Sequence, residues 1–136
     1  MRANYNVRMY RLTVETEFAA AHAIVMRGEC EPLHGHNWRV TVTVTGRSLD
    51  EDGLLCDFHA VETSLRAAVE RFHNRNLNET APFDRVNPTA EHVARHLAEA
   101  VAGGIPAQDA ARGVRVESVR VTEAPGCAAT FFPRES

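Results

Sequence analysis

The chain has 136 residues, of which 44% are hydrophobic and 24% charged, and its formal net charge is -3 at pH 7. This length suits one domain with one hydrophobic core, and the slightly acidic balance offers no excess of positive charge to a nucleic-acid backbone or an anionic membrane. We therefore expect a single domain over residues 1–136, with no nucleic-acid partner and no membrane partner.

Residues 10–18 and 38–46 alternate apolar and polar side chains, a pattern that predicts two strands with one wet face each. In the second segment, Val40, Val42 and Val44 share one face. Because the two segments are close in sequence, we expect them to pair as an antiparallel hairpin.

Two helices are predicted next. Asp57 is placed to cap a helix over residues 58–72, whose apolar side chains recur at spacings of three and four. Asn87 is placed to cap the second helix, with Pro88 at its first position. The glycines at 103–104 are expected to end it.

Residues 113–123 and 127–132 predict two further strands, and a slip of the apolar phase between Val116 and Val119 predicts a bulge. The predicted order is β-β-α-α-β-β. It indicates an α+β domain with both helices on one face of an antiparallel sheet. Such a small sheet has exposed edges, which favours oligomerisation.

Three histidines are candidate metal ligands. His34 and His36 lie two residues apart in an extended segment, so their side chains point to the same side. The hairpin would bring His22, at the end of the first strand, close to them. Three neutral imidazoles suit Zn²⁺ and leave a position for water or substrate. The alternative is a core histidine beside a His-Gly-His surface turn.

Cys30, Cys56 and Cys127 are an odd number of widely spaced cysteines without a C-x-x-C motif. We therefore expect no disulfide framework, and we expect the protein to be cytoplasmic. Cys30 precedes His34 by four residues, and a thiol beside a dication deprotonates readily and can act as a base or nucleophile. The position also suits a fourth zinc ligand or an inert thiol.

Acidic and basic groups elsewhere offer two more candidates. Glu123 ends a strand behind apolar residues of the same face, so its carboxylate is expected to be partly buried and to need a partner. A heterocycle with two adjacent N–H groups is one such partner, and a lysine or arginine is the other. His92 and His96 are one helical turn apart, a spacing that can hold a metal but here is more typical of a solvated face.

Six motifs in chain order resemble one known family. They are E-F-A-A-A-H, C-E-P-L-H-G-H, G-L-L-C-D-F, N-R-N-L-N, N-P-T-A-E and V-R-V-T-E-A-P-G. This set is similar to the 6-pyruvoyl-tetrahydropterin synthase and 6-carboxy-tetrahydropterin synthase family, and it runs from about Met9 to Phe132.

The resemblance implies a tunnelling fold (T-fold), in which β-β-α-α-β-β subunits form trimeric barrels that stack into homohexamers with active sites between subunits. It implies a zinc-dependent lyase that converts 7,8-dihydroneopterin triphosphate to 6-carboxy-5,6,7,8-tetrahydropterin, a step toward 7-deazapurines such as queuosine. Alternatives are 6-pyruvoyl-tetrahydropterin synthase activity, another substrate in a specialised pathway, or a pterin-binding homologue without activity.

The resemblance also assigns roles to individual residues. It implies Zn²⁺ on His22, His34 and His36, with Cys30 as the base that removes a proton. It implies that Glu123 anchors the pterin ring and takes part in proton transfer, and that Thr122 and Glu91 help to bind the substrate.

One motif departs from the family. Relatives usually carry Asp-His before the L-N loop, whereas this chain has His73-Asn74. Asparagine cannot transfer a proton at neutral pH. We therefore expect His73, an imidazole suited to acid–base work near neutrality, to act as the catalytic acid or base from one residue earlier. The alternative is that His73 caps the C-terminus of the first helix.

Overall fold

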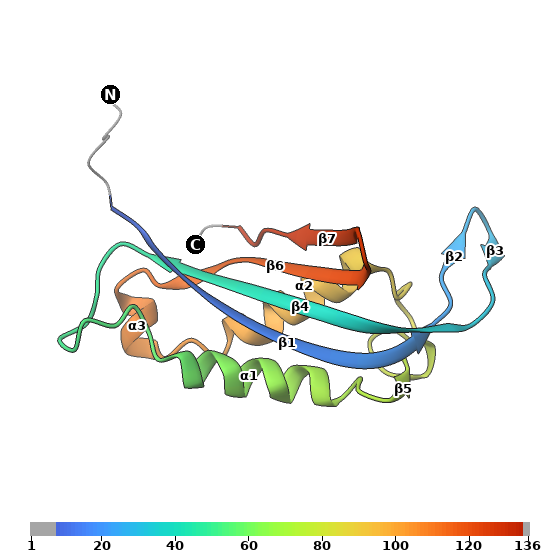
Figure 1. The fold of residues 1–136 in the computed structure, drawn as a ribbon, viewed down its shortest axis with the longest axis horizontal. Helices are drawn as coiled ribbons and strands as arrows, with labels where there is room; N and C mark the ends of the chain where they lie inside the picture. The colour runs from blue at the N-terminus through green and yellow to red at the C-terminus, as the bar shows by residue number, and fades with distance from the viewer. Residues whose placement is uncertain (1–7, 135–136) are drawn as a thin grey trace, which may run out of the picture.

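The computed structural model describes residues 8–134, which form a twisted sheet with helices on one face (Figure 1). The five-stranded sheet has the order β5-β1-β4-β6-β7, in which β5 is parallel to β1 and the other neighbours are antiparallel. Its strands are β1 (Tyr10–His22), β4 (His34–Gly46), β5 (Arg75–Asn76), β6 (Arg115–Ala124) and β7 (Cys127–Phe131).

The helical layer lies on one side of this sheet, with α1 packed on β1 and α2 on β6 and β7 (Figure 1). Its elements are α1 (Phe58–Glu70), the 3₁₀ helix η1 (Leu77–Glu79), α2 (Ala90–Ala102) and α3 (Ala107–Ala111). A small hairpin of β2 (Val25–Met26) and β3 (Glu29–Cys30) projects from the end of β1 and β4. No helix within residues 8–134 is long and apolar enough to cross a membrane.

The predicted α+β order is confirmed, as is the pairing of the first two long strands from Tyr10 opposite Gly46 to His22 opposite His34. The alternation works as expected, because even-numbered residues of both strands face the helices. The core between the layers includes Val14, Phe18, Val40, Val42 and Val44 from the sheet and Leu65, Val69, Val93 and Leu97 from the helices.

Trp38 fills the end of this core nearest the three histidines. Its side chain is fully buried, stacks on Phe18 with ring centroids 5.9 Å apart, and donates its indole N–H to the carbonyl of Ala20 at 3.1 Å. The indole also meets His22 and His36 edge-on, at centroid distances of 4.8 and 5.7 Å. The imidazoles of His22 and His36 therefore pack against a fully buried indole.

The prediction of a cap at Asp57 is confirmed, because its carboxylate accepts a hydrogen bond from His59 N–H. The prediction of a cap at Asn87 with Pro88 in the first turn is wrong. Instead, Thr89 caps α2, because its hydroxyl oxygen accepts a hydrogen bond from His92 N–H at 3.1 Å. The side chain of Asn87 is engaged elsewhere, as described below.

The predicted bulge is confirmed. Glu117 is left out of the β4–β6 ladder between Val116 and Ser118. Beyond it, the odd-numbered residues face the helices and Val119 is buried. Because side chains alternate along a strand, this phase carries Glu123 to the inner side at the end of β6.

The expectation that His92 and His96 form a solvated face holds only for His92. His96 is half-buried, since rings from the α1 end and the following loop cover it: Phe72 and Phe83 lie 5.5 and 5.6 Å away, centroid to centroid. Burial lowers the pKa of His96 and the Arg71 guanidinium lowers it further, against a smaller opposing effect of Glu99.

We therefore expect the protein to lose stability as pH falls below about 6.5, where unfolded chains bind the histidine proton before the folded protein does. In His96→Gln this contribution is absent. The free energy of unfolding of the wild-type protein, measured by urea melts, should exceed that of His96→Gln at about pH 8. This difference should become smaller at about pH 5. The control is His59→Gln, which removes a histidine whose side chain is 85% exposed instead of half-buried. Parallel pH profiles of wild type and His96→Gln would contradict the prediction.

Candidate metal centre

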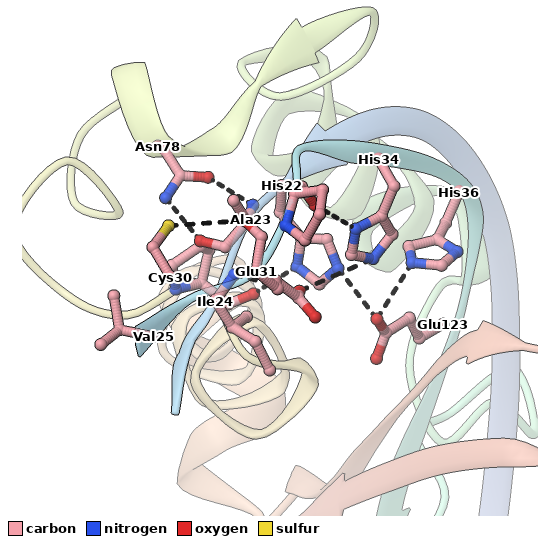
Figure 2. A network of polar contacts seen from close by, with 12 residues as sticks. His22, Ala23, Ile24, Val25, Cys30, Glu31, His34, His36, Asn78 and Glu123 are labelled. Carbon is pink, nitrogen blue, oxygen red and sulfur yellow. Dashed lines mark hydrogen bonds and ion pairs between the residues drawn. The ribbon is translucent and has the colours of Figure 1, made fainter. Parts of the chain in front are cut away.

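Three imidazoles and one carboxylate converge where β1 ends and β4 begins (Figure 2). One ligating atom from each of His22, His34, His36 and Glu123 lies within 4.8 Å of all the others. The hairpin register creates this arrangement, because His22 pairs directly with His34, and His36 follows on the same face of β4. The group could hold a metal ion.

Backbone carbonyls orient two of the rings. His22 Nδ1 lies 2.8 Å from the carbonyl oxygen of Pro88, and His34 Nδ1 lies 2.9 Å from that of Pro32. A carbonyl only accepts, so each Nδ1 carries the proton and each Nε2 presents a lone pair. This is the arrangement by which proteins orient histidine ligands toward a metal.

The Nε2 atoms of His22 and His36 are buried and, among the described residues, have no hydrogen-bond partner. Glu123 Oε1 lies only 2.9 and 3.1 Å from them, but these contacts lack hydrogen-bond geometry. The lone pair of His22 Nε2 and this carboxylate repel one another unless a positive charge lies between them. The donor set therefore fits a cation, and imidazole nitrogens with one carboxylate suit Zn²⁺.

The His36 ring is held in the form that a metal needs. Burial lowers the pKa of His36, and the carboxylate of Glu123 only partly offsets this effect. The neighbouring His22 and His34 lower the same pKa further. The neutral imidazole, which is the ligand, is therefore favoured at neutral pH.

Glu123 contributes to the metal centre and to the pockets around it. Its side chain is 28% exposed, as expected for a partly buried carboxylate, and its neighbours are histidines instead of a lysine or arginine. It lines a pocket of about 570 Å³ with Glu91 and Cys127. It lines a second, of about 520 Å³, with Thr122 and His36. The three predicted substrate-binding residues thus border cavities that meet at Glu123.

Cys30 lies outside the group of ligating atoms. Its thiol is exposed and donates to the carbonyl oxygen of Glu31 at 3.5 Å. In the view of Figure 2 it lies on the Asn78 side of the histidines, away from Glu123. The geometry therefore gives no support to Cys30 as a fourth ligand.

Glu31 was not among the predicted site residues, yet its carboxylate lies beside the histidines. Oε1 of Glu31 is 3.7 Å from His34 Nε2 and accepts a hydrogen bond from Ile24 N–H at 3.0 Å. The signal available in the sequence was an acidic residue three positions before His34, in the same loop as the candidate base.

The family assignment rests on a match over most of the chain. The family model described as 6-pyruvoyl tetrahydropterin synthase matches residues 11–134. The chain belongs to the 6-pyruvoyl tetrahydropterin synthase family. It is therefore a member of a family of pterin synthases and lyases.

Curated relatives carry two different names. A protein of Archaeoglobus fulgidus named putative 6-carboxy-5,6,7,8-tetrahydropterin synthase is 30% identical over 110 residues, which cover 81% of this chain and 84% of that protein. A protein of Pyrococcus furiosus named dihydroneopterin monophosphate aldolase is 31% identical over 96 residues, which cover 71% of this chain and 78% of that protein.

The fold is that of the 6-pyruvoyl tetrahydropterin synthase family. The solved structure of the Caenorhabditis elegans 6-pyruvoyl tetrahydropterin synthase matches 96% of this chain and 100% of that chain, with a TM-score of 0.78 at 18% identity. The predicted T-fold is confirmed. Within residues 8–134, the single chain supplies an open sheet and no closed barrel.

In this member of the family, the His73-Asn74 pair lies on the outer edge of β1. His73 Nδ1 accepts from Ala19 N–H at 3.2 Å, and Asn74 N–H donates to the carbonyl of Ala19 at 2.6 Å. Asn74, with a positive φ of 59°, lines a pocket of about 560 Å³ beside His36. The His73 ring is exposed; it contacts the β1 edge, and the C-cap of α1 is Arg71.

Proposed function

We propose that this protein is a zinc-dependent pterin lyase that converts 7,8-dihydroneopterin triphosphate to 6-carboxy-5,6,7,8-tetrahydropterin. The observation that carries the proposal is the convergence of three histidines and Glu123 within 4.8 Å, in which the buried Nε2 atoms of His22 and His36 have no hydrogen-bond partner within residues 8–134. Bound Zn²⁺ would act as a Lewis acid toward side-chain oxygens of the substrate and acidify adjacent C–H bonds.

The chain's own residues divide the remaining tasks. Carboxylates of Glu91 and Glu123 share one pocket, where they would accept hydrogen bonds from the ring N–H groups of a pterin. Thr122 would add a hydroxyl from the neighbouring pocket. Cys30, as thiolate, would take a proton from a side-chain carbon of the substrate.

The experiment is turnover of 7,8-dihydroneopterin triphosphate by the purified protein, with the products identified by mass spectrometry. We expect 6-carboxy-5,6,7,8-tetrahydropterin in the presence of Zn²⁺ and loss of activity after chelation. Tight pterin binding by the fully zinc-loaded protein without turnover would overturn the proposal.

A second candidate function is a retro-aldol cleavage of a dihydroneopterin side chain. One relative is named an aldolase. In the loop before His34, the carboxylate of Glu31 lies 3.7 Å from His34 Nε2, whereas the Cys30 thiol donates to the carbonyl of Glu31. In this reaction a base accepts the proton of a side-chain hydroxyl, the C–O bond becomes a carbonyl, and the electrons of the broken C–C bond go to the pterin side, which is then protonated. Glu31 would serve as that base.

The two functions separate by substitution. If the protein is an aldolase, Glu31→Gln should abolish cleavage and Cys30→Ala should retain most of it. If it is the lyase, Cys30→Ala should carry the larger loss. Product identity gives the independent control, since the two reactions release different fragments.

We propose that His73 supplies the second acid–base group, although its ring faces the β1 edge in a single chain. His73→Ala should then lower the turnover rate by about 10²-fold or more with zinc content unchanged. The matched control is His59→Ala, which removes an exposed imidazole from α1. A His73→Ala variant at the wild-type rate would show that the group comes from elsewhere.

We further infer that the chain assembles into trimers or hexamers, as the resemblance implies, and that it resides in the cytoplasm, as expected from its odd number of widely spaced cysteines. Within residues 8–134, β7 pairs on one side only, and β5 covers the outer edge of β1 only at Ala20 and Ala21. Open edges are stabilised by pairing with other copies. Light scattering should give the mass of three or six chains, and a monomer would contradict this inference.

A further inference from the structure

Two asparagine side chains hold the chain where it leaves β1. Asn78 accepts a hydrogen bond from Ala23 N–H at 2.8 Å and donates one to the Ala23 carbonyl at 2.7 Å. Asn87 makes the same pair of bonds with Val25, both at 2.9 Å. A carboxamide offers a donor and an acceptor side by side, so each asparagine makes with these residues the pair of bonds that a neighbouring strand would make.

Ile24, between the two held residues, is tied to Glu31. Glu31 N–H donates to the Ile24 carbonyl at 3.0 Å, and Ile24 N–H donates to the Glu31 carboxylate, also at 3.0 Å. The same carboxylate lies beside His34 (Figure 2). Both backbone polar groups of three consecutive residues are therefore fixed in place.

The position of Cys30, the candidate base, depends on the same hydrogen bonds. Val25, which Asn87 holds, pairs directly with Cys30 across the β2–β3 hairpin. The Cys30 thiol in turn bonds to the carbonyl of Glu31. Asn87 thus acts on Cys30 through Val25, and Asn78 acts on Glu31 through Ala23 and the adjacent Ile24. Neither asparagine belongs to the group of ligating atoms at the metal centre.

Both asparagines are anchored outside the hairpin. Asn78 lies in η1, and its backbone N–H donates to the side chain of Asn76 at 3.0 Å. Asn87 immediately precedes Pro88, whose carbonyl orients His22. Asn78 is therefore held by the helical layer. Asn87 is joined through the backbone to Pro88, which contacts a histidine of the metal centre.

We propose that Asn78 and Asn87 are positioning residues that hold the Cys30–Glu31 loop against the metal centre. This inference rests on the proposed function for the roles of Cys30 and Glu31. The histidines sit on the β1–β4 ladder, which does not depend on the asparagine side chains. Removing the amides should therefore displace the base and leave the metal in place.

The test compares Asn78→Ala and Asn87→Ala with the wild-type protein in the presence of Zn²⁺. We expect kcat to fall by about 10- to 100-fold, as for other misplacements of a reacting group, with a smaller change in KM and unchanged zinc content. Hydrogen exchange followed by mass spectrometry should be faster in peptides covering residues 23–31 and unchanged in the middle of β1.

The matched control is Thr45→Val. Thr45 donates to the carbonyl of Tyr10 at 3.0 Å, a side chain–backbone bond at the far end of the same strand pair. Its loss should lower stability but leave kcat and exchange of residues 23–31 as in wild type. If an alanine variant fails to fold, Asn78→Asp and Asn87→Asp keep the acceptor, lose the donor, and should show a smaller effect of the same kind.

Three results would overturn the proposal: zinc lost in proportion to activity, unchanged exchange at residues 23–31, or faster exchange with unchanged kcat. A wild-type protein that is inactive on 7,8-dihydroneopterin triphosphate would instead overturn the proposed function. The exchange pattern and the zinc content would then still decide whether the asparagines hold this loop.

Discussion

The double variant His34→Ala, His36→Ala should bind no Zn²⁺ and lose activity by about 10³-fold or more, the rate equivalent of the several kcal/mol that a Lewis-acidic ion supplies. Two of the three imidazoles are removed, and His22 with Glu123 alone leaves the ion without a tetrahedral set. Elemental analysis of the purified protein should give one zinc per wild-type chain and none in the variant.

The control for this variant is His59→Ala, which removes an exposed imidazole of α1 and should keep full zinc content. A second readout is pH, because only neutral imidazoles bind the ion. Zinc should leave the wild-type protein as the pH falls below the imidazole range, and little should remain at about pH 4. Full occupancy in the double variant, or retention of zinc at that pH, would sink the ligand assignment.

Cys30→Ala should keep its zinc and lose about 10²- to 10⁴-fold in turnover, the usual contribution of a general acid or base. The reason is geometric: the thiol is not among the atoms that converge on the metal centre, whereas the loop carrying it is held beside that centre. Parallel measurement of kcat and bound zinc separates a base from a ligand. Loss of zinc together with activity would contradict this role.

Cys56→Ala is the matched control for Cys30. Cys56 is buried in the core and burial raises its pKa, so the thiol stays protonated, and its removal should lower stability by roughly 1 kcal/mol with little effect on rate. Cys127 is a less suitable control, because it is exposed and lines the pocket shared with Glu91 and Glu123.

The convergence of the histidines could be predicted because it depends on local rules. His34 and His36 share a face through strand alternation, and a short hairpin brings His22 opposite His34. Glu123 was placed on the correct face for the same reason, once the bulge was read from the slip in apolar phase. These features need only the period of a strand and one pairing.

The hydrogen bonds of Asn78 and Asn87 near the metal centre could not be predicted in this way. Asn78 and Asn87 bond to residues 55 and 62 positions earlier, and no local pattern identifies such partners. The Asn-Pro pair is typical of the start of a helix, but Thr89, two residues after Asn87, is the residue that caps α2. The burial of His96 likewise depends on rings from a distant loop, and α3 is too short for its periodicity to show.

The tryptophan beneath the histidines has a practical consequence. Trp38 is the only tryptophan in the chain, so the tryptophan emission of the protein arises from one indole whose neighbours are known. Because His22 and His36 meet that indole edge-on, a change in their charge or in what they bind alters its electronic surroundings directly. The protein thus carries its own optical probe at the metal centre, and titrations of metal or acid can be followed without an added label.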